Sequence, residues 1–159
     1  MLNQPLGLAR YLEIKVKINI KKLHSEAVVP KYATPGDAGM DLHAVSNGEA
    51  DRYGNMVYKT GLAVEIPTGH VGLIYPRSSV SKTSHMLRNH VGVIDSGYRG
   101  EIILKFGWYE TSPGHQLFYK KGDRIGQIVI MPHPEIEFVE VTELSATHRA
   151  SGGFGSTGQ

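Results

Sequence analysis

Residues 89–101 of the chain read Asn-His-Val-Gly-Val-Ile-Asp-Ser-Gly-Tyr-Arg-Gly-Glu. Apolar residues precede a polar tip, and a second apolar run continues from residue 101 to 106, which is the pattern of a β-hairpin. Because glycine allows close approach of the backbone, the tip can present main-chain groups to a flat ligand, with Asp95 and Tyr98 beside it. An ordinary hairpin with turn-forming residues explains the same stretch, so both interpretations stay open.

The composition limits the class of protein. The 159 residues fit one domain, and 17 basic against 15 acidic residues give a charge too balanced to indicate, by itself, binding to nucleic acid or membrane. The chain has no cysteine, which excludes disulfides and thiolate metal sites. No apolar run approaches the ~20 residues of a membrane span, and residues 1–5 lack a signal pattern. We therefore expect a soluble, cytoplasmic protein.

The apolar pattern predicts many short strands. Alternation over residues 12–20 predicts a half-buried strand, and further strands are expected at 41–45, 62–66, 71–75, 124–131 and 136–141. Residues 46–58 look like a surface excursion, and 79–87 are the one candidate helix. This pattern favours an antiparallel sandwich, jelly roll or barrel. The expected organisation is a loose leader over 1–10, a single β-rich domain over 11–144 and a flexible glycine-rich arm over 145–159.

Two segments before the hairpin contain candidate functional side chains. Residues 37–42 carry two carboxylates around a glycine; Asp41 can orient water around a divalent cation or brace a polar group, and a solvated turn is the alternative. Arg77, Ser78 and Ser79 stand at the start of the expected helix, where N–H groups, hydroxyls and a guanidinium favour phosphate. Simple capping of the helix by a serine explains the same residues.

Two segments after the hairpin raise the same question. Gln127 is polar in an apolar strand, and its amide needs a hydrogen-bond partner such as a phosphate oxygen, although the preceding Gly-Asp is a common turn. The tail has the composition of a disordered terminus. Yet Arg149, Phe154 and Ser156 are groups that can close over a nucleotide by pairing with phosphate and stacking on a base. A tail that is mobile alone and ordered by a ligand satisfies both interpretations.

Standard catalytic motifs are missing. The chain has no phosphate loop of the Gly-x-x-x-x-Gly-Lys-Ser/Thr type and no dinucleotide-binding fingerprint. Its eight histidines show no metal-ligand spacing on a credible helix, and no serine has a convincing His and Asp pairing on a nucleophile turn. His85 and His90 are predicted to be surface or packing residues.

In this order, segments 37–42, 76–79, 92–101, 122–127 and 149–158 resemble the five motifs of the trimeric deoxyuridine triphosphatase (dUTPase) family, over a region from about Leu23 to the C-terminus. The resemblance implies a distorted β jelly roll and a homotrimer whose active sites are shared between subunits. It implies Mg²⁺-dependent hydrolysis of dUTP to dUMP and pyrophosphate. Such an enzyme limits uracil in DNA and supplies dUMP for thymidylate synthesis, without a nucleic-acid or membrane partner.

The resemblance also implies roles for residues of the hairpin. Asp95 corresponds to the carboxylate that activates the attacking water at the α-phosphorus, and Tyr98 to the ring packed under the deoxyribose. The groups that correspond to readers of the uracil edge are Asn89 and the backbone of Gly92, Val93 and Ile94. Many relatives carry another acid where this chain has Ser96-Gly97, so no second carboxylate is expected beside Asp95.

The other four segments correspond to the phosphate side and the closing arm. The implied phosphate ligands are Arg77, Ser78, Ser79 and Gln127. Asp41 corresponds to a carboxylate that supports the metal–water shell. The implied arm residues are Arg149, Phe154 stacking on uracil, Gly155 and Ser156. Two alternatives are a dCTP deaminase on a similar fold and a nucleotide-sensing or protein-binding module; the 94–98 sequence and the Gly-Gly-Phe-Gly arm favour the hydrolase.

Overall fold

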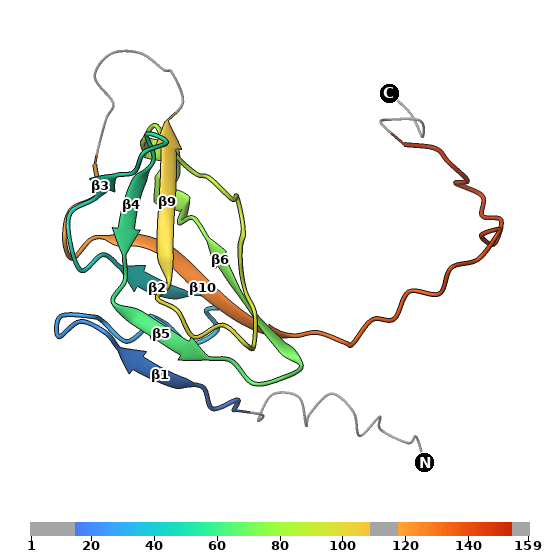
Figure 1. Cartoon of the computed structure of the whole chain (residues 1–159), viewed down its shortest axis with the longest axis horizontal. Helices are drawn as coiled ribbons and strands as arrows, with labels where there is room; N and C mark the ends of the chain where they lie inside the picture. Colours follow the sequence, from blue (N-terminus) through green and yellow to red (C-terminus); the bar gives the residue numbers. More distant parts are fainter. Residues whose placement is uncertain (1–14, 109–117, 154–159) are drawn as a thin grey trace.

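The chain folds into antiparallel sheets in a computed structural model that describes residues 15–108 and 118–153 (Figure 1). A two-stranded sheet joins β1 (Asn19–Lys22) to β5 (Leu62–Glu65). The second sheet has the order β2 (Met40–His43), β10 (Arg124–Pro132), β6 (His70–Tyr75) and β8 (Gly92–Ile94). The third has the order β3 (Glu49–Ala50), β4 (Met56–Lys59), β9 (Ile103–Trp108) and β7 (His85–Leu87). This all-β arrangement confirms the distorted jelly roll that the family resemblance implies.

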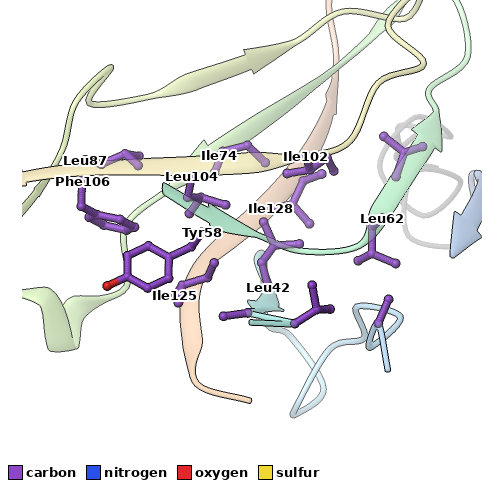
Figure 2. Packing of buried hydrophobic residues seen from close by; sticks show 14 of the residues in the cluster. Leu42, Tyr58, Leu62, Ile74, Leu87, Ile102, Leu104, Phe106, Ile125 and Ile128 are labelled. Atoms are coloured by element: carbon purple, nitrogen blue, oxygen red, sulfur yellow. The ribbon is translucent and has the colours of Figure 1, made fainter. Parts of the chain in front are cut away.

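The hydrophobic core lies between the second and third sheets (Figure 2). Leu42 and Ile128 reach it from the second sheet, and Leu104 and Phe106 reach it from the third. Tyr58 is also fully buried, and its hydroxyl accepts a hydrogen bond from the Tyr119 backbone N–H at 3.2 Å. Each such side chain contributes about 1.5–3 kcal/mol through burial, so this core holds the two sheets together.

The predicted hairpin over residues 89–101 is wrong in its pairing. β8 pairs with β6, whereas β9 pairs with β4 and β7, so the two strands belong to different sheets. The alternating pattern specifies which face of a strand is buried but not which strand lies next to it. Residues 95–102 therefore form a loop that crosses from the second sheet to the third.

Other strand predictions have mixed outcomes. β5, β6 and β10 confirm the strands expected at 62–66, 71–75 and 124–131, and β2 confirms the one at 41–45. The expected helix over 79–87 is wrong in extent, because it is a 3₁₀ helix over Ser78–Lys82 followed by β7. Residues 46–58 contain β3 and β4 rather than an excursion. In the described part of 12–20, the strand begins only at Asn19.

After β10 the chain leaves the body of the molecule as a long extended segment, orange to red in Figure 1. The strand expected at 136–141 does not form there. Its apolar side chains lie in solvent, with Phe138 95% and Ile136 64% exposed. No helix of the described residues is long and apolar enough to cross a membrane.

Candidate active site

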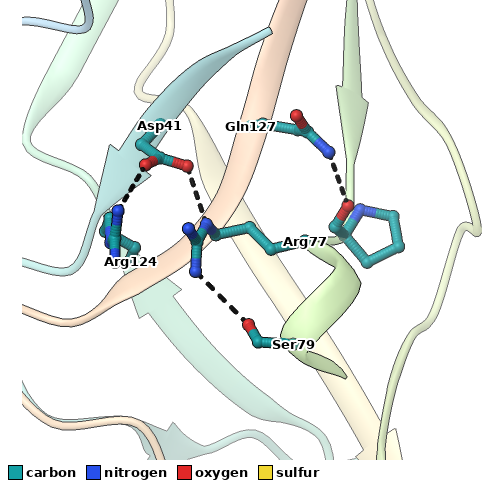
Figure 3. A network of polar contacts seen from close by, with 6 residues as sticks. Asp41, Arg77, Ser79, Arg124 and Gln127 are labelled. Atoms are coloured by element: carbon teal, nitrogen blue, oxygen red, sulfur yellow. Dashed lines mark hydrogen bonds and ion pairs between the residues drawn. The ribbon is translucent and has the colours of Figure 1, made fainter. Parts of the chain in front are cut away.

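An arginine–aspartate cluster, made of Asp41, Arg77, Ser79 and Arg124, forms at one end of the second sheet (Figure 3). β10 pairs with both β2 and β6, which brings Asp41 on β2 close to Arg77, two residues beyond β6. The Arg77 Nε donates to Asp41 Oδ1 at 2.7 Å, and the Arg124 Nη1 donates to Oδ2 at 3.2 Å. Both carboxylate oxygens of Asp41 are thus held by guanidinium groups.

The cluster has an excess of positive charge. Its two guanidinium groups face one carboxylate, which leaves a formal charge of about +1. His43 lies on the same face of β2, two residues after Asp41. Burial lowers the pKa of His43 against the opposing effect of the Asp41 carboxylate, and Arg124 and Arg77 lower it further, so this ring is neutral at neutral pH. A polyanion would be attracted to this end of the sheet.

The serines of the 3₁₀ helix do not cap it. The residue before the helix is Arg77, whose side chain makes no capping hydrogen bond, and the Ser79 Oγ instead accepts a bond from Arg77 Nη1 at 3.3 Å. Ser78 is exposed. Because the helix has only five residues, a helix dipole adds little here, and the attraction for phosphate rests on the guanidinium and hydroxyl groups.

Gln127 joins the cluster to the end of β6. Its Nε2 donates to the carbonyl oxygen of Pro76 at 3.0 Å, which supplies the partner that a half-buried amide requires (Figure 3). Gly39 permits this arrangement, because a Cβ on Gly39 would lie 2.4 Å from the Gln127 Oε1. A side chain at position 39 would therefore force the Gln127 amide to move.

Residues 92–94, which are expected to read the uracil edge, lie at the open edge of the same sheet. β8 is the last strand of that sheet, so one edge of Gly92, Val93 and Ile94 has no strand partner in the described part of the chain. Val93 is 61% exposed. A Cβ on Gly92 would lie 3.2 Å from the Nδ2 of Asn89, which places the Asn89 amide against this backbone. Main-chain groups and one amide are thus available together to a flat ligand.

A pocket of about 240 Å³ follows β8 and is lined by Val93, Ile94, Asp95, Tyr98, Glu101 and Ile103. The Tyr98 hydroxyl donates to the Glu101 carbonyl oxygen at 3.0 Å. A Cβ on Gly100 would lie 2.4 Å from that hydroxyl, so glycine is needed for the ring to fold back. Asp95 is exposed at the pocket, and its carbonyl oxygen accepts the Tyr98 N–H at 3.0 Å.

Sequence reasoning missed two charged residues. The sequence has no acid at positions 96–97, so no second carboxylate is expected beside Asp95. In the structure, Glu101 places a second carboxylate in the pocket that Asp95 lines. Its Oε1 accepts the Gly61 N–H at 2.7 Å, which ties the loop to the turn between β4 and β5. Arg124 was noticed only as part of a turn-and-strand segment. No signal in the sequence separates Arg124 from the other basic residues, because its contact with Asp41 depends on the pairing of β10 with β2.

The chain does not bring all of its predicted site residues together. Within the described residues, no member of the arginine–aspartate cluster lines the Asp95 pocket. Arg149 lies in the extended segment, where its Nε donates to the Gly152 carbonyl oxygen at 3.1 Å. The predicted roles of Phe154, Gly155 and Ser156 fall outside the described residues.

The described residues do not form a metal cage. No group of three or more His, Asp or Glu side chains that could hold a metal ion occurs among them. Each oxygen of Asp41 accepts one hydrogen bond from an arginine, and Asp41 is the only carboxylate in the arginine–aspartate cluster. Mg²⁺ usually binds through substrate phosphates and water with few protein carboxylates, and this donor set fits only that mode.

The family model described as dUTPase matches residues 25–158. The deoxyuridine 5'-triphosphate nucleotidohydrolase of Nautilia profundicola is 42% identical over 146 residues, which cover 91% of this chain and 100% of the relative. The enzyme of the same description from Thermobifida fusca is 39% identical over 144 residues, which cover 90% of this chain and 79% of the relative.

Solved structures agree with these relatives. The dUTPase of Staphylococcus bacteriophage 80alpha, as a mutant with dUpNHpp, matches with a TM-score of 0.71 and 29% identity, covering 91% of this chain and 100% of that one. A mutant dUTPase of phage phi11 of S. aureus, described as showing the coordination of a structural Mg(II) ion, matches with a TM-score of 0.63 and 26% identity, covering 80% and 98%. By sequence and by fold, this chain belongs to the dUTPase family of enzymes, which hydrolyse dUTP to dUMP.

Proposed function

We propose that the chain hydrolyses dUTP by in-line attack of water on the α-phosphorus, with Asp95 as the general base. The observation that supports this most is the Asp95 pocket, which joins an exposed carboxylate to the open backbone edge of β8. A single carboxylate within hydrogen-bond reach of one water suffices for such a step. The proton of the attacking water passes to Asp95, the bond between the α- and β-phosphates breaks, and pyrophosphate leaves with that electron pair.

Base and sugar selection follow from the same pocket. Backbone groups of Gly92, Val93 and Ile94, with the Asn89 amide, would read the uracil edge as a paired base would. Tyr98 would pack under the deoxyribose, where its hydrogen bond to Glu101 holds the ring in place. One misfitting methyl or hydroxyl is worth only about 1–3 kcal/mol in a soft pocket, so selection depends on the rigidity of this loop.

The phosphate chain would bind at the arginine–aspartate cluster, through its members Arg77 and Ser79 and through the neighbouring Ser78 and Gln127. The excess positive charge of the cluster and the fixed direction of Arg77 support this assignment. Mg²⁺ would arrive on the phosphates and supply charge neutralisation there. The role of Asp41 toward the metal would be indirect: each of its oxygens accepts one hydrogen bond from an arginine and keeps a lone pair that can accept from a metal-bound water. The similar dUTPase of phage 80alpha has been solved with dUpNHpp, which supports the proposal that this chain binds a nucleoside triphosphate.

The active form would be a homotrimer in which the arm of one subunit closes the site of another. Arg149, Phe154, Gly155 and Ser156 would wrap the nucleotide, with Phe154 stacking on uracil. The exposed apolar side chains of the extended segment support a partner, because Phe138 and Ile136 are mostly uncovered by the described residues. The proposed setting is the cytoplasm, where hydrolysis would limit uracil in DNA and supply dUMP.

That segment of a second copy would bind in an apolar groove of about 610 Å³ beside β1. Its lining includes Val16, Ile18, Ile20 and Tyr32. The charges of the two partners are complementary: the segment carries Glu135, Glu137, Glu140 and Glu143, and residues 15–22 carry Lys15, Lys17, Lys21 and Lys22. Addition of an extended segment to an open strand edge is a common mode of protein association.

Replacement of Asp95 tests the mechanism. In Asp95→Asn, the amide cannot take the proton, so we expect kcat for dUTP to fall by about 10²–10⁴-fold. The dissociation constant for dUpNHpp should change by less than about threefold, since shape and backbone contacts are kept. Rapid-quench measurement of pyrophosphate release gives the first quantity and calorimetry the second. Near-normal turnover in the folded variant would remove Asp95 as the base.

A further inference from the structure

Asp41 holds its two arginines unequally. Arg77 is bound at 2.7 Å through Nε, is further held by Ser79, and its side chain is 24% exposed. Arg124 is bound only through Nη1, at 3.2 Å, and its side chain is 52% exposed. Exposed ion pairs with a single contact contribute little to stability. Arg77 is therefore fixed in place, whereas Arg124 is held weakly at the surface.

Most of the hydrogen-bonding capacity of Arg124 is unused. A guanidinium has five N–H donors in a planar fork, and the described contacts of Arg124 use one of them. Such a fork matches the oxygens of a phosphate, where two parallel charge-assisted bonds are stronger than one bond to a shared carboxylate. Arg124 therefore has more to gain from a phosphate than from Asp41.

If the Arg124 side chain moves away, Asp41 still has Arg77 as a partner. The Arg77 Nε still donates to Oδ1 at 2.7 Å, so the half-buried carboxylate keeps a strong charge-assisted bond. Movement of Arg77 from Asp41 to a phosphate is less favourable, since Arg77 would lose its hydrogen bonds to both Asp41 and Ser79. Arg124 also stands at the start of β10, three residues before Gln127 on the strand that joins the cluster.

We propose that Arg124 is a further phosphate ligand, which Asp41 holds at the edge of the site until a nucleotide binds. The guanidinium leaves Asp41 and binds the β- or γ-phosphate, while Asp41 keeps Arg77 in position. Arg124 thus discriminates among uridine nucleotides by the number of their phosphates. The proposal rests on the assignment of the phosphate chain to the arginine–aspartate cluster.

The test is a series of ligands that differ only in phosphate number. The full-length protein and Arg124→Gln are titrated with dUMP, dUDP and dUpNHpp in the presence of Mg²⁺. We expect Arg124→Gln to bind dUpNHpp about tenfold more weakly, as for the loss of a charge-assisted pair. Binding of dUMP should change by less than about twofold. Arg124→Lys, which keeps the charge but not the fork, should recover part of the loss.

A matched control separates a ligand from a structural brace. Lys105 has a similar exposed ion pair, at 3.1 Å to Asp51 and with 50% exposure, away from the cluster, so Lys105→Gln should leave all three affinities unchanged. Equal weakening for dUMP and dUpNHpp, or no weakening for either, would overturn the proposal. Arg77→Gln distinguishes a failure of the phosphate site as a whole from a failure of the role of Arg124 alone. If it also binds dUpNHpp normally, the phosphate assignment itself is wrong; if it binds weakly while Arg124→Gln binds normally, only the role of Arg124 fails.

Discussion

The two halves of the candidate site differ in how they are built. The arginine–aspartate cluster joins side chains from β2, β10 and the segment after β6, and Asp41, Arg77 and the neighbouring Gln127 each have a polar partner inside the chain. The 89–101 loop has an open backbone edge, an exposed Val93 and an exposed Asp95. The first half is assembled before a ligand arrives, and the second half is left open.

This difference matches the chemistry that each half would perform. Phosphate binding needs charged donors at fixed positions, because preorganised donors do not have to reorient when the ligand binds. Base reading needs unpaired backbone groups, which remain unpaired only where no neighbouring strand covers them. An open edge also leaves the base exposed on one side, so the loop requires a cover from elsewhere, and the arm of another subunit is the proposed one.

Mixing two inactive variants gives the strongest test of this division. Asp95→Asn lacks the proposed base, and a chain truncated after His148 lacks the arm, so each alone should lose about 10²-fold or more in kcat. Co-refolded mixed trimers contain sites with Asp95 from the truncated chain and the arm from the Asp95→Asn chain. We expect turnover to recover well above that of either parent. Light scattering confirms the trimer, and no recovery in a mixed trimer would show that each site uses a single chain.

A pair of glycine substitutions compares the packing of the two halves. In Gly39→Ala, the new methyl group displaces the Gln127 amide and breaks its bond to Pro76, so we expect KM for dUTP to rise about three- to tenfold. The free energy of unfolding should fall by about 1 kcal/mol, the worth of one hydrogen bond. In Gly97→Ala, the new methyl group meets no atom within 4 Å. The free energy of unfolding of this variant should therefore stay within about 0.5 kcal/mol of the wild-type value.

Steady-state kinetics and urea unfolding measure both glycine variants. A normal KM in Gly39→Ala would mean that Gln127 does not need its observed position. A large loss of stability in Gly97→Ala would mean that the loop is packed as tightly as the cluster, and the contrast between the two halves would then disappear.

The fold could be predicted where apolar residues gather in short runs. Residues 62–66, 71–75 and 124–131 are such runs and predict β5, β6 and β10, although β5 buries three consecutive residues rather than one alternating face. β3 was missed because Glu49 and Ala50 are both exposed and leave no pattern. The pairing of β8 with β6 could not be predicted, because contacts between strands distant in sequence depend on the packing of the whole sheet.

The candidate site could be predicted as a set of segments but not as a set of contacts. Asp41 and Arg77 are both in the predicted segments, yet their ion pair arises only because β10 lies between β2 and β6. The same convergence brings Arg124 to Asp41 over a separation of 83 residues. The sequence pattern places Glu101 at the start of a strand, whereas in the structure its carboxylate accepts a hydrogen bond from the Gly61 backbone N–H.

The smallest expected effect, on the free energy of unfolding, comes from a buried histidine outside both halves of the site. This histidine separates the pH dependence of the fold from that of the site. His85 is 4% exposed, stacks on Tyr119 with ring centroids 5.0 Å apart, and has no hydrogen-bond partner for either ring nitrogen among the described residues. Burial lowers the pKa of His85 below its usual 6.5. The unfolded chain therefore binds a proton at a pH where the folded chain does not.

The contribution of His85 to stability is thus complete above about pH 6.5 and is lost as the pH falls toward the folded pKa, at up to about 1.4 kcal/mol per pH unit. His85→Leu should remove this part of the pH dependence, whereas His24→Gln, at an exposed position, should keep it. Urea unfolding at fixed protein concentration, followed by fluorescence of Trp108, the single tryptophan, compares the variants at pH 5.5 and 7.5. If the wild type and His85→Leu lose stability equally on acidification, the titrating groups lie elsewhere. Activity of His85→Leu over the same range then reports the site alone, because the fold no longer titrates through this ring.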